Sequence, residues 1–256
     1  MNYLGPLRVY PSRDYSFAGA TPEEVGWTGS AAIGAVLAAS RAGRKLSTGN
    51  RQRNYPFEVF LAQRLEELEL IESFQAKEIG RNSQRYEVEV RVTKESPLVN
   101  MKDVGFGVSQ ILPVIVQCYY SKPDSIIIME QPELHLHPRV QANLADSFIT
   151  ALRSKEDGAD RNVQIVVESH SEHFLRRLQK RIAEEELTED DVAIYFCDRE
   201  NGKSVIEELE VDTYGNIRNW PENFFGDQFA EIADQQKRAI ERQIEDRENV
   251  NGSDND

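Results

Sequence analysis

The sequence predicts an α/β protein in which a mainly parallel sheet is flanked by helices and preceded by an α+β lobe. The apolar run over residues 126–129 has the β-branched composition of a strand that is buried on both faces of a parallel sheet, and a further apolar strand is expected over residues 163–167. Apolar residues recur at helical spacing after each run, over residues 138–153 and 171–186. Such alternation implies right-handed crossovers, so the carboxyl ends of the strands meet at one edge of the sheet.

The remaining elements divide the chain into three parts. The first part, residues 1–100, is the α+β lobe, with an irregular or edge-strand opening over 1–29, helices over 30–42 and 56–70, and a hairpin of strands over 74–79 and 86–92. The second part, residues 101–215, carries the sheet, with a helix over 111–120 and strands over 125–129, 162–168, 192–198 and 204–209. Pro113 is expected in the first turn of its helix, where proline is tolerated. The third part, residues 216–256, is expected to hold a Phe-rich turn, a charged helix that ends near residue 247, and a disordered tail from residue 249.

The composition is that of an acidic globular protein. The 256 residues carry a formal net charge of −14, which argues against non-specific DNA binding. The basic stretch over residues 41–53 is most simply a solvated loop, with a phosphate or nucleic-acid contact as the alternative. No apolar run reaches the length of a membrane span and no signal-peptide pattern opens the chain, so a cytoplasmic location with no membrane partner is expected. Cys118 and Cys197 lie in apolar neighbourhoods, which predicts buried, reduced thiols.

Two carboxylates follow the first apolar run. The run ends at Glu130, Pro132 prevents the strand from continuing, and Glu133 comes next. Ligands of open α/β sheets bind at the carboxyl ends of the strands, where nucleotide hydrolases use acids to hold a hydrated Mg²⁺ against phosphates. The sequence therefore predicts a Mg²⁺ and phosphate site at this position, with a solvated acidic turn as the alternative.

Two further features are expected at the same edge of the sheet. Gly105 and Gly107 precede an apolar helix, whose free backbone N–H groups favour an anion, and Ser109 and Gln110 add side-chain donors. A flexible connection without a ligand is the alternative. His170 follows the second run, where its side chain can donate to a phosphate or serve only at the start of the next helix, which Ser171 is placed to cap.

The order and content of these three features resemble the C-terminal half of ABC-type ATPases, in the prokaryotic SMC-like and OLD-nuclease-like branch of the AAA-family ATPases. The resemblance begins near Tyr3, is most specific over residues 104–173, and includes a C-terminal extension of uncertain role around residues 216–226. It implies a P-loop NTPase fold that binds ATP and Mg²⁺. Proteins of this kind act as head-to-head dimers, in which the signature motif of one head contacts the γ-phosphate held by the Walker A loop of the other.

The resemblance also implies a role for each motif. Residues 105–110 lie where the signature motif lies, and residues 126–130 correspond to Walker B, with Glu130 as the Mg²⁺ ligand. Gln131 stands at the position of the catalytic glutamate. Residues 134–138 resemble the D-loop, which brings His137 to the nucleotide, and His170 is the switch histidine.

Three departures from the family pattern matter for function. The sequence has no Walker A loop: residues 201–204 end like one, but Cys197 stands where its first glycine belongs, and Asn-Gly between two strands predicts a hairpin instead. Gln131 cannot accept a proton, so either Glu133 orients the attacking water or hydrolysis is slow. Gly105 replaces the signature serine, so contact with the γ-phosphate must come from backbone N–H groups or from Ser109.

Two classes of function follow. The first is half of an ATPase site, completed by a Walker A-bearing lobe or partner chain in a homo- or heterodimer of heads, with a DNA-linked or phage-defence effector such as a nuclease, and with nucleic acid as a possible partner. The second is a non-catalytic interaction module that uses ATP as an assembly switch.

Two metal sites are weaker alternatives. His135, His137, His170 and His173 could form a zinc site, although such short spacings arise readily by chance. Glu168 and Asp198 supply too few acids for a Toprim-like nuclease centre.

Overall fold

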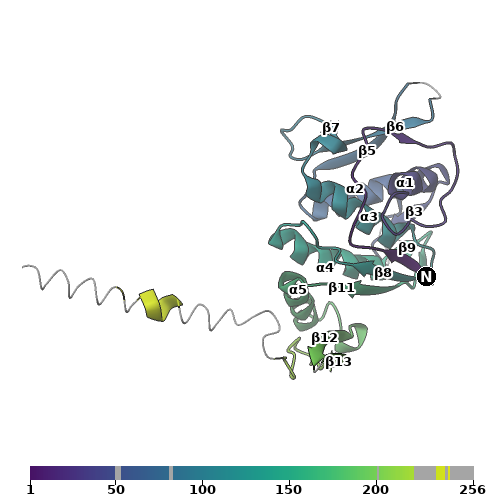
Figure 1. Cartoon of the computed structure of the whole chain (residues 1–256). Coiled ribbons are helices and arrows are strands. Elements are labelled where there is room, and N and C mark those ends of the chain that lie inside the picture. Colours follow the sequence, from purple (N-terminus) through teal and green to yellow (C-terminus); the bar gives the residue numbers. More distant parts are fainter. Residues whose placement is uncertain (50–52, 81–82, 201, 222–234, 240–241, 243–256) are drawn as a thin grey trace, which may run out of the picture. The chain divides into compact units, whose positions relative to one another are not determined.

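A computed structural model describes residues 1–49, 53–80, 83–200, 202–221, 235–239 and 242. The chain forms two compact units, residues 1–187 and 188–256 (Figure 1). The mixed α/β architecture expected from the sequence is confirmed, while the three-part division at residues 100 and 215 stays a prediction. None of the helices in the described part of the chain combines the length and the apolar character that crossing a membrane requires.

The first unit is organised around a three-stranded parallel sheet. Its strands are β1 (Asn2–Leu4), β8 (Ile126–Glu130) and β11 (Gln164–Glu168), in the order β1-β8-β11, so the expected edge strand near the N-terminus is present. One face of the sheet is buried under α3 and α4, and it carries Ile127 and Met129. The expectation that β8 is buried on both faces is wrong, because Ile126, on the opposite face of the sheet, is 42% exposed. Val166 of β11 is 46% exposed on that face as well.

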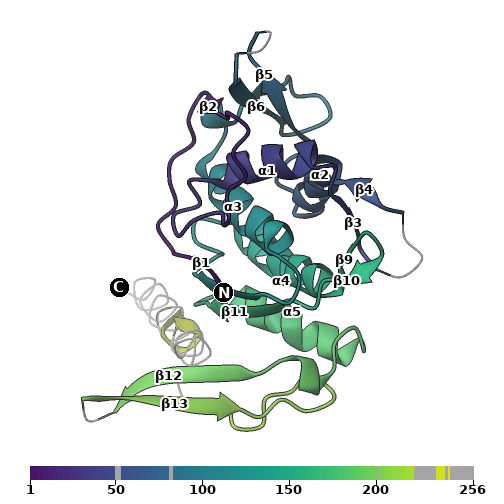
Figure 2. The ribbon, with the colours of Figure 1, turned by 90° about the vertical axis from the view of Figure 1, so that its right-hand side faces the viewer.

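Five helices surround or form the core of this unit. They are α1 (Ala32–Arg41), α2 (Phe57–Glu67), α3 (Phe106–Tyr120), α4 (Pro138–Arg153) and α5 (Glu172–Ala183). The central helix is α3, which contacts α1, α2 and α4 and buries every residue from Val108 to Tyr120 (Figures 1 and 2). An all-round apolar surface of this kind is typical of a helix in the middle of a core.

Helix α3 begins earlier than the sequence predicts. It starts at Phe106 with Gly105 as its N-cap residue, so Pro113 lies in the helix interior and the expectation of a first-turn proline is wrong. An interior proline cannot donate to the carbonyl four residues before it, and its ring needs space beside the helix. Gly29 provides that space: a Cβ atom added at Gly29 would lie 2.5 Å and 2.8 Å from the Cβ and Cγ atoms of Pro113.

This contact predicts that Gly29→Ala destabilises the first unit strongly. The backbone at Gly29 has a φ of +73°, so the methyl group adds backbone strain to the clash with Pro113, and we expect a loss of about 2–4 kcal/mol. Gly43→Ala is the matched control, because Gly43 has a φ of +68° but no atom within 4 Å of an added Cβ. Chemical denaturation of both variants separates the two costs, and equal destabilisation would contradict the packing argument.

Two small antiparallel sheets complete the first unit. One contains the predicted hairpin, β5 (Ser73–Glu78) with β6 (Arg85–Arg91), flanked by β2 (Tyr15–Ser16) and β7 (Val99–Asn100). The other joins distant parts of the chain in the order β10 (Ala159–Asp160), β9 (Lys155–Glu156), β3 (Lys45–Ser47) and β4 (Tyr55–Pro56). A short 3₁₀ helix, η1 (Met101–Asp103), leads from the hairpin toward α3.

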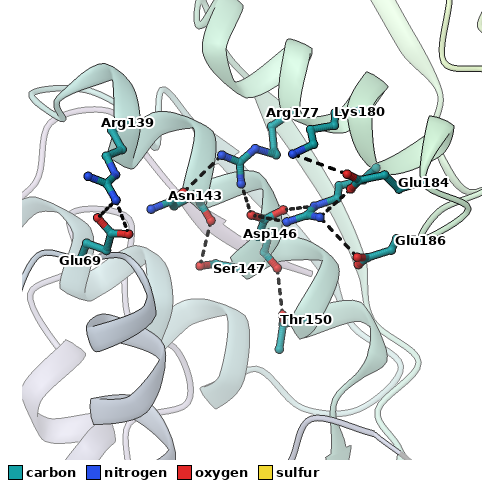
Figure 3. A network of polar contacts seen from close by, with 11 residues as sticks. Glu69, Arg139, Asn143, Asp146, Ser147, Thr150, Arg177, Lys180, Glu184 and Glu186 are labelled. Atoms are coloured by element: carbon teal, nitrogen blue, oxygen red, sulfur yellow. Dashed lines mark hydrogen bonds and ion pairs between the residues drawn. The ribbon is translucent and has the colours of Figure 1, made fainter.

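Helices α4 and α5 are held together by a polar network centred on Asp146 (Figure 3). Its carboxylate accepts hydrogen bonds from Arg181 at 2.7 Å and 3.0 Å and pairs with Arg177. These bonds raise the pKa of Arg181 above its ordinary value, with Glu184 contributing further. Helix α4 follows β8 and helix α5 follows β11, so the network links the two strand–helix units that lead from the candidate site.

The second unit contains a regular hairpin. After η2 (Glu189–Asp191), β12 (Ile194–Glu200) and β13 (Lys203–Leu209) pair along their full length in antiparallel register (Figure 2). The predicted hairpin is confirmed, whereas the expectation that residues 192–198 continue the parallel sheet is wrong, because β12 and β13 form a two-stranded sheet separate from β1, β8 and β11. Cys197 is exposed here, contrary to expectation, while Cys118 is buried and burial raises its pKa to about 12.

Part of the predicted C-terminal region can be placed. Residues 235–239 are helical, in agreement with the expected charged helix. The Phe-rich turn around residues 224–229 and the tail from residue 249 lie outside the described residues.

Candidate functional site

The carboxyl ends of β8 and β11 meet as the sequence predicts. Glu130 and Glu168 are register partners at the last positions of the two parallel strands. The hydroxyl of Tyr3, from edge strand β1, donates a hydrogen bond of 2.8 Å to Oε1 of Glu130. That bond stabilises the protonated phenol and raises the pKa of Tyr3. Glu130 is half-buried, so its carboxylate is oriented by the protein and still reaches solvent.

The turn after β8 is tightly constrained. Gln131 has a φ of +43°, a conformation that side-chain-bearing residues rarely adopt. Its N–H donates to the carbonyl of Glu168 at 2.8 Å, and its own carbonyl accepts from Leu134 at 3.1 Å. The turn therefore reverses the chain directly beside β11 and directs the next carboxylate inward.

Glu133 is the most unusual group of this edge. Its side chain is only 6% exposed, and Oε1 accepts a hydrogen bond of 2.9 Å from the backbone N–H of His170. Oε2 is buried and has no hydrogen-bond partner among the described residues. Buried carboxylate oxygens are normally hydrogen-bonded, so an oxygen that lacks a partner in the described part of the chain marks Glu133 as a candidate functional group.

Arg8 belongs to the same site, and sequence reasoning missed it. The guanidinium is 6% exposed and donates from Nη2 to the carbonyls of Glu130 and Gln131 at 3.0 Å and 3.1 Å. Burial lowers the pKa of Arg8 to about 10, and the charge of Glu133 opposes that shift. The one signal available was an arginine directly after a predicted edge strand.

The signature segment presents backbone rather than side chains. Gly105 is exposed, Gly107 is half-buried, and no side chain caps the first turn of α3. Ser109 and Gln110 are buried, and the Ser109 hydroxyl donates to the Phe106 carbonyl at 2.8 Å. In this conformation, the two side chains expected to add donors point into the protein, and the exposed groups are those at the helix start.

The histidines occupy separate positions. The side chain of His170 is 78% exposed, with Nε2 at 3.0 Å from Oε1 of Glu168. His137 caps α4, its Nδ1 accepting from the N–H of Arg139 at 3.3 Å, and Ser171 caps α5 as predicted. The ring of His135 lies 4.9 Å from that of Phe106, which brings the predicted D-loop turn against the start of α3.

The described residues contain no group of three or more His, Cys, Asp or Glu side chains that could hold a metal. This arrangement does not support the zinc or Toprim-like alternatives. Magnesium makes a different demand, because one or two carboxylates suffice when water and phosphate oxygens supply the other ligands. Glu130, half-buried at the end of β8, fits that demand in chemistry and in position.

Comparison with known proteins identifies part of the chain. Residues 53–175 match the AAA ATPase domain family, and residues 187–235 match a family described as a protein of unknown function (DUF3696). No curated protein matches the sequence.

Several solved structures of SMC proteins are similar in shape. One, from work on ATP-driven dimerization and DNA-stimulated activation of SMC ATPases, is 14% identical over 60% of this chain and 83% of that chain, with a TM-score of 0.42. The Smc head domain of Pyrococcus furiosus bound to the C-terminal domain of ScpA is 11% identical over 59% of this chain and 34% of that chain, with a TM-score of 0.43. An SmcHead bound to the C-winged helix domain of ScpA is 11% identical over 60% of this chain and 42% of that chain, with a TM-score of 0.41.

Identities and TM-scores this low carry no argument about this chain. The similarity to an ATPase domain therefore rests on the family match alone. That match covers α2, α3, β8, β11 and the turn that carries Glu133. Residues 53–175 are therefore similar to an AAA-family ATPase domain.

Proposed function

We propose that this chain supplies the acidic half of an ATP-hydrolysing site, which a Walker A loop from outside residues 1–256 completes. The observation that carries the proposal is the pairing of a half-exposed carboxylate, Glu130, with a buried one, Glu133, whose second oxygen lacks a partner among the described residues. Glu130 is the last residue of β8 and Glu133 lies in the turn that follows, inside the stretch that matches an AAA ATPase domain. ATP is the expected substrate and Mg²⁺ the expected ion.

Glu130 is the proposed Mg²⁺ ligand, acting through water. The hydroxyl of Tyr3 engages Oε1, which orients the carboxylate, and Oε2 remains able to accept from a hydrated ion. Bound Mg²⁺ would neutralise charge on the β- and γ-phosphates. Oε1 of the neighbouring Glu168 contacts Nε2 of His170, which keeps the imidazole ring at the same edge of the sheet. From there, His170 is proposed to donate to a phosphate.

Glu133 is the proposed group that orients and deprotonates the attacking water. Gln131, at the usual position of the catalytic base, can only form hydrogen bonds with that water. The N–H of His170 holds one oxygen of Glu133, which leaves the other oxygen for the water. A base held by a backbone donor in this way needs little rearrangement before reaction.

The start of α3 is proposed to meet the γ-phosphate of a second head. Backbone N–H groups at Gly105 and Gly107 lie at the positive end of this helix. Ser109 and Gln110 are proposed to support the start of α3 from their buried positions in the protein. His137 lies in the adjacent turn. A dimer of heads follows from this assignment, with DNA-linked or defence functions depending on the effector that it drives.

A second candidate is an ATP-gated switch without turnover. Gln131 favours it, because a site that lacks its usual base can bind ATP and assemble without hydrolysing it. Single-turnover measurements with radiolabelled ATP distinguish the two functions, since the switch retains intact ATP in the assembled dimer.

Glu130→Gln tests the proposed ATPase function. In the assembly that includes the Walker A loop, we expect Mg²⁺-dependent phosphate release to fall by about 10–100-fold, because the amide orients the ion's water poorly and carries no charge. Raising the Mg²⁺ concentration should recover part of the loss. Glu66→Gln, at an exposed position of α2, is the matched control and should leave the rate unchanged.

Two results would overturn the proposal. One is that the chain adds nothing to the phosphate release of the Walker A-bearing partner alone. The other is that Glu130→Gln and Glu66→Gln behave alike at every Mg²⁺ concentration.

A further inference from the structure

The segment from residue 3 to residue 13, here called the N-terminal strap, starts in contact with the last residue of β8. The hydroxyl of Tyr3 contacts the side chain of Glu130, and Arg8 contacts the backbone of the next turn. Nη2 of Arg8 bridges the two successive carbonyls of Glu130 and Gln131, and these carbonyls flank the strained residue of the turn. A single buried guanidinium therefore fixes the point at which β8 turns toward Glu133.

The other end of the strap lies at the signature segment. The ring of Tyr10 is 5.2 Å from that of Phe106, the first residue of α3. Arg13 forms a two-pronged ion pair with Asp103, at 2.7 Å and 3.0 Å. The carbonyl of Arg13 also accepts from Asn100 at 2.9 Å. One short stretch of chain thus connects both sequence motifs of the proposed site.

We propose that Arg8 is a positioning residue that holds the turn over residues 130–133 in the conformation in which Glu133 acts. The inference rests on the proposed function, and it assigns Arg8 no direct contact with ATP. Arginine suits this task because its planar guanidinium holds Nη2, the one nitrogen that donates to both carbonyls, in a fixed orientation. A lysine ammonium also has more than one donor, but it rotates freely on a flexible stem, so we expect it to replace these bonds only in part.

The remaining atoms of Arg8 separate this role from ordinary packing. Nε and Nη1 are buried and have no hydrogen-bond partner among the described residues. A guanidinium that only filled the core would be expected to satisfy all its nitrogens or to be replaced by an apolar side chain. Glu133 is the acid whose charge acts on Arg8, which places the unused donors in the field of the proposed base.

Hydrogen exchange of the 256-residue chain tests the positioning role without any catalysis. In Arg8→Met, we expect exchange at the amides of Gln131, Leu134, Leu136 and His170 to accelerate by about tenfold or more, because their hydrogen bonds all depend on this turn. Arg8→Lys should give an intermediate acceleration. Arg13→Met is the matched control, since it removes the exposed end of the strap and should leave these four amides unchanged.

A kinetic comparison in the complete ATPase assembly supplies the second readout. Arg8→Met should lower kcat by about 10–100-fold and leave KM for Mg²⁺–ATP within about threefold, because the variant disturbs the base and not the bound substrate. A higher KM with unchanged kcat would overturn the inference. So would unchanged exchange at the four amides, or equal acceleration throughout α2 and α3, which indicates general destabilisation.

The exchange and kinetic experiments distinguish failure of the proposed ATPase function from failure of the role proposed for Arg8. If the wild-type assembly releases no phosphate, the proposed function fails, and the exchange data alone then decide whether Arg8 holds the turn. If Arg8→Met does not fold, Arg8→Lys is judged by the same two criteria.

Discussion

Glu133→Gln is expected to lower kcat for ATP hydrolysis by about 10²–10⁴-fold, the usual contribution of a positioned general base. The substitution keeps the shape of the side chain and an oxygen that can accept from the N–H of His170, so the turn should remain intact. Only the capacity to take a proton is lost. Phosphate release under saturating ATP measures the effect, and ATP binding should change little.

Two companion variants make this result specific. Gln131→Ala should lower kcat by less than about tenfold, because Gln131 contributes hydrogen bonds without accepting a proton. Adding Gln131→Glu to Glu133→Gln should restore part of the rate, since it returns a carboxylate to the usual position of the base. If Glu133→Gln keeps a third or more of the wild-type kcat, Glu133 is not the base.

Arg161→Met is expected to destabilise the first unit by about 3–5 kcal/mol, the typical cost of breaking a buried charge network. Arg161 is fully buried and donates to the carbonyls of Cys118 and Ser121 at 2.8 Å and 2.6 Å. These are carbonyls at the end of α3, which have no partner within the helix. Burial lowers the pKa of Arg161, and Glu156 at 3.7 Å from Nε opposes that shift.

The control for Arg161 is Arg153→Met. Arg153 is 49% exposed and pairs with Glu186 at 3.8 Å, so its loss should cost less than about 1 kcal/mol. Urea denaturation followed by circular dichroism compares the two variants. Similar midpoints for both would contradict the role assigned to Arg161 at the end of α3.

A second arginine, Arg44, also binds carbonyls at the end of α3, which differs from what the sequence predicts. Arg44 donates to the carbonyls of Tyr119 and Tyr120, each at 3.1 Å, and pairs with Glu156 at 2.6 Å. The stretch over residues 41–53 was expected to be a solvated basic loop, yet Arg44 closes the end of the central helix. Positive side chains are favoured there because they oppose the negative end of the helix dipole.

Local sequence patterns were enough to predict several parts of this protein. The apolar run before Glu130, the run before His170 and the helix that follows each run were predictable, because strand and helix periodicities extend over a few consecutive residues. Their alternation also placed Glu130 beside the end of the next strand, as the register with Glu168 confirms. The roles of Gln131 and Glu133 in catalysis stay predictions until turnover is measured.

The groups that complete the edge of the sheet come from distant parts of the chain and became visible in the folded structure. Arg8 meets the carbonyls of Glu130 and Gln131 across more than a hundred residues of sequence, and a buried arginine leaves no periodic signal. The burial of Glu133 and the exposure of one sheet face likewise depend on which elements pack together. These features arise because the cost of burying a charge or exposing an apolar side chain is set by neighbours in space, which local sequence does not specify.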